Sequence, residues 1–159
     1  MDENLKREII MEHYQNPINR NTIEDSSYTK VNSNSETCID DIDLYIKFEN
    51  NKIVDIHFNG EACAISTSAT SIMIKLLIGK TIEEVKELIN NYYNMIDEKE
   101  YNEDILKEAC CYSGICKQQN RKGCATIPWK GIEKAINAYE KENQIWFSYL
   151  FYIKRYKYK

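Results

Sequence analysis

The spacing of apolar residues changes at Gly60, and this change constrains the fold more than any other feature of the chain. Before it, apolar and polar residues alternate over 42–48 and again over 54–58. Alternation with a period of two is typical of strands that bury one face, so we expect a β-hairpin that turns at Asn50–Asn51. After Gly60, apolar residues recur at helical spacing over 65–77, which predicts a helix there.

Other segments carry weaker signals of the same kinds. Residues 3–14 predict a helix, and residues 19–37, rich in Asn, Ser and Thr, predict a loop or a weak strand. "TIEE" at 81–84 is a capping box that opens another helix. The last predicted helix covers 125–141, with Pro128 in its first turn, where a missing N–H is tolerated.

Composition bounds the class of protein. The chain has 159 residues, of which 43% are hydrophobic, enough for one domain with its own core. The net charge is −4 with acids and bases mixed, which argues against a nucleic-acid partner. The longest aromatic and apolar run, 145–153, is far shorter than the ~20 residues of a membrane span. We expect a single domain over 1–144, followed by an aromatic and then basic tail over 145–159.

The start of the chain and its cysteines suggest a compartment. "MDENLKREII" is charged from its second residue, so we expect no secretory signal and a cytoplasmic protein. Thiols stay reduced in the cytoplasm. Six cysteines in that setting indicate metal or sulfur chemistry before disulfides.

Cysteines stand at the ends of several predicted elements. Cys63 lies where a helix begins, and the unpaired N–H groups there favour a thiolate. A small buried residue at a strand–helix corner is an equally good interpretation of Cys63 alone. Cys38 and Asp40 project to one side of an extended segment, and Cys124 precedes the last helix. Three thiols and one carboxylate suit a tetrahedral zinc ion, and thiolates also hold iron–sulfur clusters.

Four stretches of the chain resemble one family. "EHYQNPIN", "CID", "NGEACAISTSATSIM" and "RKGCATIPWKGIEKAI" are similar to motifs of iron–sulfur cluster assembly scaffolds of the NifU N-terminal, IscU and SufU type. The resemblance runs from about Leu5 to Ala138, and "NGEACAISTSATSIM" is its most specific piece. It implies an α+β fold, with a small, mainly antiparallel sheet and helices packed on it.

The resemblance also implies a site. Cys38, Asp40, Cys63 and Cys124 take the places of the family's metal or cluster ligands, and Arg121 that of a basic residue before the last cysteine. The 61-residue separation of Cys63 and Cys124 favours the SufU-like branch, which resembles zinc-bound sulfur acceptors. Three departures put partner contact and efficiency in question: isoleucine replaces glycine at position 39, glycine replaces lysine or histidine at position 123, and Gln119 stands where a proline is common.

These features lead to a functional hypothesis. The resemblance implies a protein that accepts sulfur from a SufS-like cysteine desulfurase at a Cys₃Asp zinc site, rather than a stand-alone enzyme. Cys38 is the first candidate acceptor and Cys124 the second, with Arg121 as a supporting charge. Apo iron–sulfur proteins or assembly factors would act downstream.

Two alternatives remain open. The same four ligands could hold a transient [2Fe–2S] cluster. In a different class, the chain could be a structural zinc protein that uses the local cysteines of "CCYSGICKQQNRKGC", namely Cys110, Cys111, Cys116 and Cys124.

Overall fold

The predicted hairpin forms the centre of a three-stranded antiparallel sheet of order β1-β2-β3. In the computed structural model, which describes residues 1–157 except the side chains of Gln119, Phe147, Tyr156 and Lys157, β2 (Asp41–Glu49) pairs with β3 (Lys52–Glu61). Asn50 and Asn51 turn the chain with φ of 50° and 60°, as expected of a two-residue hairpin turn. The weak strand is β1 (Thr29–Asn34), which pairs with the other edge of β2.

Helices make up the rest of the fold, so the α+β class is confirmed. The helix after the hairpin begins at its predicted place, with Cys63 as N-cap, and Thr81 and Glu84 form the predicted capping box. The elements outside the sheet are α1 (Glu3–Gln15), α2 (Ala64–Leu77), α3 (Ile82–Ile96), α4 (Glu103–Leu106), the 3₁₀ helices η1 (Lys107–Tyr112) and η2 (Ile115–Lys117), and α5 (Gln119–Lys157).

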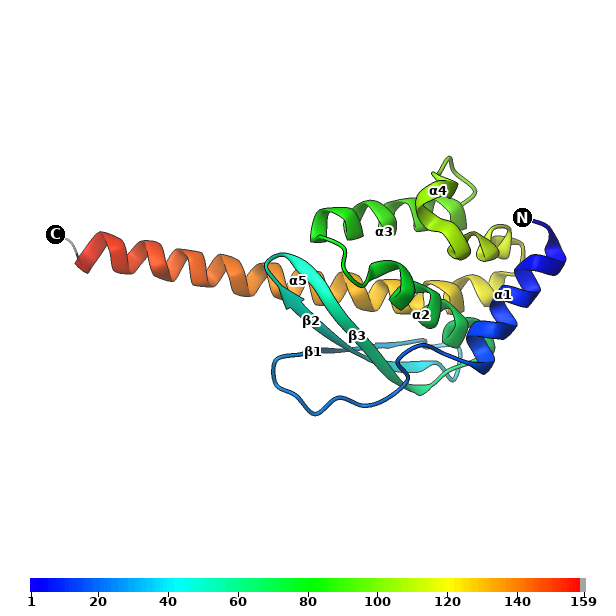
Figure 1. The fold of residues 1–159 in the computed structure, drawn as a ribbon, viewed down its shortest axis with the longest axis horizontal. Helices are drawn as coiled ribbons and strands as arrows, with labels where there is room; N and C mark the ends of the chain where they lie inside the picture. Colours follow the sequence, from blue (N-terminus) through cyan, green and yellow to red (C-terminus); the bar gives the residue numbers. More distant parts are fainter. Residues whose placement is uncertain (158–159) are drawn as a thin grey trace.

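The core lies between the sheet and the helices. Helices α2 and α5 pack on the sheet, and α3 lies farther out (Figure 1). The alternating residues Ile42, Leu44 and Ile46 of β2 are completely buried. Tyr92 of α3 stacks on Trp129 of α5, with ring centroids 4.2 Å apart. This packing fixes the starts of α2 and α5 against the end of the sheet where β2 begins.

Helix α5 differs from its prediction. It covers 119–157 rather than 125–141, and Pro128 lies inside it rather than in its first turn. Proline cannot donate to the carbonyl four residues earlier, which belongs to Cys124. That carbonyl oxygen lies 3.0 Å from the hydroxyl oxygen of Ser66 in α2.

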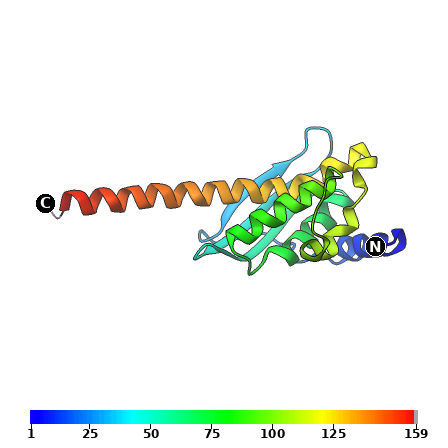
Figure 2. The same ribbon diagram turned by 90° about the horizontal axis from the view of Figure 1, so that it is seen from above.

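The C-terminal part of α5 extends beyond the rest of the molecule as a single helix, seen in two perpendicular views (Figures 1 and 2). It continues into the predicted tail without a break. Despite its length, neither α5 nor any other helix within residues 1–157 is apolar enough to cross a membrane.

Candidate metal centre

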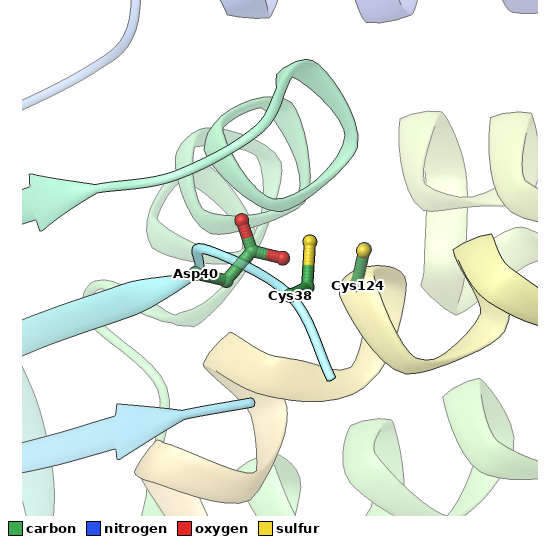
Figure 3. Close-up of side chains that lie close together, drawn as sticks. All are labelled: Cys38, Asp40 and Cys124. Carbon is green, nitrogen blue, oxygen red and sulfur yellow. The ribbon is translucent and has the colours of Figure 1, made fainter. Parts of the chain in front are cut away.

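The loop before β2 brings two of the predicted site residues to one place. The Ser35 N–H donates to the Asp40 carbonyl at 3.0 Å and closes the loop. The chain bends at residues 36–39, so the extended segment expected here is not formed. Cys38 and Asp40 nevertheless lie together beside the start of α5 (Figure 3), whereas Ile39 is 69% exposed.

Cys124 completes a group of three. One ligand atom from each of Cys38, Asp40 and Cys124 lies within 4.8 Å of the others (Figure 3). Asp40 and Cys124 are buried, at 1% and 6% exposure, while Cys38 is exposed. The group therefore has a protected interior and one thiol at its mouth.

Cys63 approaches the same carboxylate from the start of α2. Its N–H donates to Asp40 Oδ1 at 2.7 Å, and its Sγ lies 3.7 Å from Asp40 Oδ2. As the N-cap of α2, its sulfur also accepts the Ser66 N–H at 3.4 Å. The structure thus places the other three sequence-predicted ligands near Asp40, with Cys63 outside the group of three but in contact with the carboxylate.

Hydrogen bonds determine the charge state of Asp40. Burial raises the pKa of this carboxyl, but hydrogen bonds from the Ser66 hydroxyl and the Cys63 N–H outweigh it and hold the pKa below its ordinary value. Burial raises the pKa of the Cys124 thiol, and the neighbouring Asp40 carboxylate and Cys63 sulfur raise it further. Without a cation, the site therefore favours an ionised Asp40 beside a protonated Cys124.

Ser66 belongs to the site, and the sequence analysis missed it. Its fully buried hydroxyl oxygen lies 2.6 Å from Asp40 Oδ2 and 3.0 Å from the Cys124 carbonyl oxygen. It has one proton to donate, and the shorter contact to a charged acceptor favours Asp40. A signal was available: Ser66 is the third residue after the N-cap Cys63, a position whose side chain commonly reaches back.

Two other predicted positions lie beside the group. Arg121 is exposed in the first turn of α5, and its guanidinium makes no hydrogen bond or ion pair to the described site residues. It lies three residues before Cys124, on the same face of the helix. A Cβ added at Gly123 would meet no atom within 4 Å, so the space next to Cys124 is open where a side chain was expected from the family pattern.

The four local cysteines that a structural zinc site would need do not lie close together. Cys110 and Cys111 are buried in η1, and Cys116 lies in η2. No three of the four cysteines Cys110, Cys111, Cys116 and Cys124 gather at ligand distance; within the described part of the chain, only the group of Cys38, Asp40 and Cys124 does so. Burial raises the pKa of both thiols in η1, as expected of packing residues.

Comparison with known proteins gives a consistent family. The model of the NifU-like N-terminal domain matches residues 5–145. The chain is 35% identical over 142 residues to the zinc-dependent sulfurtransferase SufU of Bacillus subtilis (strain 168), covering 89% of this chain and 95% of that protein. It is 33% identical over 129 residues to the iron–sulfur cluster assembly scaffold protein IscU of Streptococcus pyogenes serotype M1, covering 80% of each.

The fold is shared with solved structures as well. A crystal structure described as an iron–sulfur cluster assembly scaffold protein for the SUF system, from Fervidobacterium islandicum AW-1, superposes with a TM-score of 0.76 at 32% identity, over 84% of this chain and 97% of that one. Three findings agree on the family: the family model matches most of the sequence, relatives exceed 30% identity, and the fold is shared. The chain belongs to the family of NifU-like N-terminal domains, which includes the SufU and IscU iron–sulfur cluster assembly proteins.

Proposed function

We propose that this protein accepts sulfur for iron–sulfur cluster assembly at a zinc site made by Cys38, Asp40, Cys63 and Cys124. The observation that carries the proposal is the group of two thiols and one carboxylate, with a third thiol, Cys63, 3.7 Å from that carboxylate. The similarity to a protein named as a zinc-dependent sulfurtransferase supports it. The activity belongs in the cytoplasm, where such thiols stay reduced.

The donor set suits zinc. Bonds of about 2.3 Å to sulfur and about 2.1 Å to oxygen separate tetrahedral donors by roughly 3.6 Å, and the Cys63 Sγ to Asp40 Oδ2 distance is 3.7 Å. Bound zinc would keep the thiols in their thiolate form. Three thiolates and a carboxylate carry two more charges than the ion neutralises, and we propose that Arg121 offsets part of this excess.

The burial of the cysteines supports the roles that we propose for them. Cys38 is the exposed thiol of the group, so its thiolate can reach a persulfide on a SufS-like cysteine desulfurase. Cys38 Sγ forms a bond to the sulfane sulfur, the bond from that sulfur to the desulfurase cysteine breaks, and the latter leaves as a thiolate. Cys38 then carries the persulfide, and Cys124 is the second candidate acceptor. The sulfur would pass on to assembly factors or apo iron–sulfur proteins.

A second function uses the same ligands. Relatives named as cluster assembly scaffolds favour a transient [2Fe–2S] cluster as cargo. The two functions differ in a simple measurement on anaerobically purified protein. About one zinc per chain and no colour supports sulfur transfer, whereas iron, sulfide and visible absorption support the scaffold.

The experiment that tests the site separates the two sets of cysteines. Single changes Cys38→Ser, Cys63→Ser and Cys124→Ser should each sharply weaken zinc retention, because a neutral hydroxyl replaces a thiolate poorly. The triple variant Cys110→Ser, Cys111→Ser and Cys116→Ser is the matched control. It should keep its zinc and its desulfurase-dependent sulfur uptake, at some cost in stability because two of these thiols are buried.

Mass spectrometry after incubation with desulfurase and cysteine locates the persulfide, which we expect first on Cys38 and second on Cys124. Loss of zinc from the triple variant, with zinc kept in Cys38→Ser and Cys63→Ser, would contradict the proposal. It would support the structural-zinc alternative instead.

A further inference from the structure

The C-terminal part of α5 exposes an unusual number of large apolar side chains. They are Ile145 (70% exposed), Trp146 (59%), Tyr149 (55%), Leu150 (40%), Phe151 (68%) and Tyr152 (60%). The match to the family domain ends at residue 145, so all of these residues except Ile145 follow the matched part of the chain. Single exposed apolar residues are common, but a continuous set of this size indicates an interaction surface.

Most of these residues lie on one face of the helix. At about 100° per residue, six side chains fall within an arc of roughly 160°, which we call the aromatic face: Ile145, Trp146, Tyr149, Leu150, Tyr152 and Ile153. Among the described side chains, the opposite side carries Gln144, Ser148, Lys154 and Arg155, with Phe151 as an apolar exception. Three rings of the aromatic face have a polar atom at the tip, which suits a boundary between water and an apolar phase.

The charge of this segment is one-sided. No acidic residue follows Glu142, whereas Lys154, Arg155, Lys157 and Lys159 lie near the end of the chain. The segment 143–159 therefore carries four positive charges, although the whole chain carries −4. Cations next to aromatic rings on an amphipathic helix are typical of segments that lie on anionic membranes.

We propose that the aromatic face and the basic residues after it dock on an anionic lipid bilayer, with the end of α5 lying in the plane of the headgroups. Pairing with the same segment of a second copy fits less well, because no acid within 143–159 can face the four cations. A lipid surface supplies both an apolar phase for the rings and phosphates for the cations.

This docking leaves the metal centre open. Cys124 and Tyr149 are 25 residues apart on one helix, which corresponds to about 38 Å. The two features lie toward opposite ends of the long axis of the molecule (Figure 1). A chain held at the membrane by its last turns would present the exposed Cys38 to partners from the aqueous side.

Trp146 makes the proposal directly measurable. The chain has two tryptophans, Trp129, which is 1% exposed, and Trp146. Mixing the full chain with phosphatidylcholine vesicles that contain phosphatidylglycerol should shift the fluorescence of Trp146 to shorter wavelength and sediment the protein with the vesicles. Pure phosphatidylcholine vesicles should bind at least 10-fold more weakly. In Trp146→Phe, sedimentation should persist and the shift should disappear.

Two pairs of variants separate charge from apolar contact. The triple change Lys154→Gln, Arg155→Gln and Lys157→Gln should weaken binding about 100-fold, since each cation contributes a severalfold factor. The control, Lys99→Gln, Lys117→Gln and Lys130→Gln, removes the same charge from exposed sites elsewhere and should change binding less than threefold. Trp146→Gln with Leu150→Gln should abolish sedimentation, whereas Met11→Gln on α1 should not.

The proposal does not depend on the proposed function, because the readouts are vesicle binding and fluorescence rather than zinc or sulfur. Absence of binding to anionic vesicles would overturn it. A second result would also overturn it: analytical ultracentrifugation shows a dimer of the unaltered chain, the double variant Trp146→Gln, Leu150→Gln is monomeric, and neither protein binds vesicles. In that case a second copy covers the aromatic face.

Discussion

Asp40 organises the candidate metal centre through hydrogen bonds within the protein. It is 1% exposed and accepts the Cys63 N–H and the Ser66 hydroxyl. An ionised carboxylate is costly to bury, and these two donors compensate for the lost water. They also fix the position of both oxygens relative to the Cys63 sulfur. The site is therefore largely arranged by the chain itself, which favours ligand binding without a large rearrangement.

A serine pair tests this arrangement. Ser66→Ala removes a donor to Asp40, so we expect zinc affinity to fall about 10-fold, as is typical for residues that orient a ligand. The control is Ser68→Ala, in which a hydroxyl equally buried in α2 loses its contacts with Tyr112 and the Ile65 carbonyl. Both changes should lower stability by about 1–3 kcal/mol. Competition with a chromophoric chelator should show the affinity loss in Ser66→Ala only; an equal loss in both would contradict the role of Ser66.

Sequence rules located the start of α2 better than the geometry of the loop before β2. The place of Cys63 at that start follows from a local change of period, whereas the extended segment expected at Cys38 and Asp40 is bent at residues 36–39. That they meet Cys124 was implied only by resemblance, because convergence over 61 residues depends on packing. The carbonyl freed by Pro128 and its contact with Ser66 also depend on tertiary structure, since the two residues belong to different helices.

The sequence patterns that predict helices and strands differ in strength from one element to the next. The hairpin and α2 were predicted well because apolar periodicity and turn residues agree there. The end of α5 was not, because its residues after 141 do not pack on the rest of the chain and so give no buried stripe. What extends the helix is the lack of a stop: no glycine or proline follows Gly131. The short α4 and the 3₁₀ turns after it are set by packing around buried Tyr112 and Cys111.

Two glycines of α5 provide a test of its packing. A Cβ at Gly123 meets no atom within 4 Å, whereas one at Gly131 would lie 2.5 Å from Leu44 Cδ1. Gly123→Ala should raise the free energy of unfolding by about 0.5–1 kcal/mol through helix propensity. Gly131→Ala should lower it by about 1–2 kcal/mol, because the buried Leu44 must move. Urea denaturation measures both, and changes of the same sign in the two variants would contradict this difference in packing.

Helix α1 is held by a polar network. His13 Nε2 lies 2.7 Å from Glu108 Oε2, its Nδ1 lies 2.7 Å from Ser71 Oγ, and Lys75 Nζ donates to Glu108 Oε1 at 2.6 Å. Burial raises the pKa of Glu108, but hydrogen bonds from Lys75 and His13 outweigh it and lower the pKa below 4.5. The stabilisation is thus complete above pH 4.5 and is lost as the pH falls through the lowered pKa.

Replacing the Glu108 carboxylate should change how the melting temperature falls at acid pH. Glu108→Gln should lower the melting temperature at neutral pH and should flatten its fall between about pH 5 and about pH 3. Thermal melts by circular dichroism at several pH values measure the slope. The exposed Glu142, changed to Gln as a control, lies outside the network. A slope in Glu108→Gln equal to that of the unaltered protein would show that the network does not stabilise the fold.

For the molecule as a whole, the proposed metal centre would add a link between segments that the core already packs together. The proposed ligands come from the loop before β2, the N-terminus of α2 and the first turns of α5. The hydrophobic core is built from the rest of the sheet and helices, with many fully buried apolar residues. Metal binding should therefore add stability to a chain that already folds, unlike small zinc domains that unfold without their ion.

Removing the metal measures this coupling. A ligand present at about 1,000 times its dissociation constant stabilises the folded state by about 4 kcal/mol, and each kcal/mol shifts the melting temperature of a chain of this size by about 2–4 °C. Complete removal of zinc by a strong chelator should then lower the melting temperature by roughly 10 °C. The far-ultraviolet circular dichroism at 25 °C should stay unchanged, and added zinc should restore the melting temperature. Cys63→Ser, which lacks one thiolate, should respond much less to the chelator. Metal analysis confirms that removal is complete. If the melting temperature is then unchanged, no ion connects these three segments.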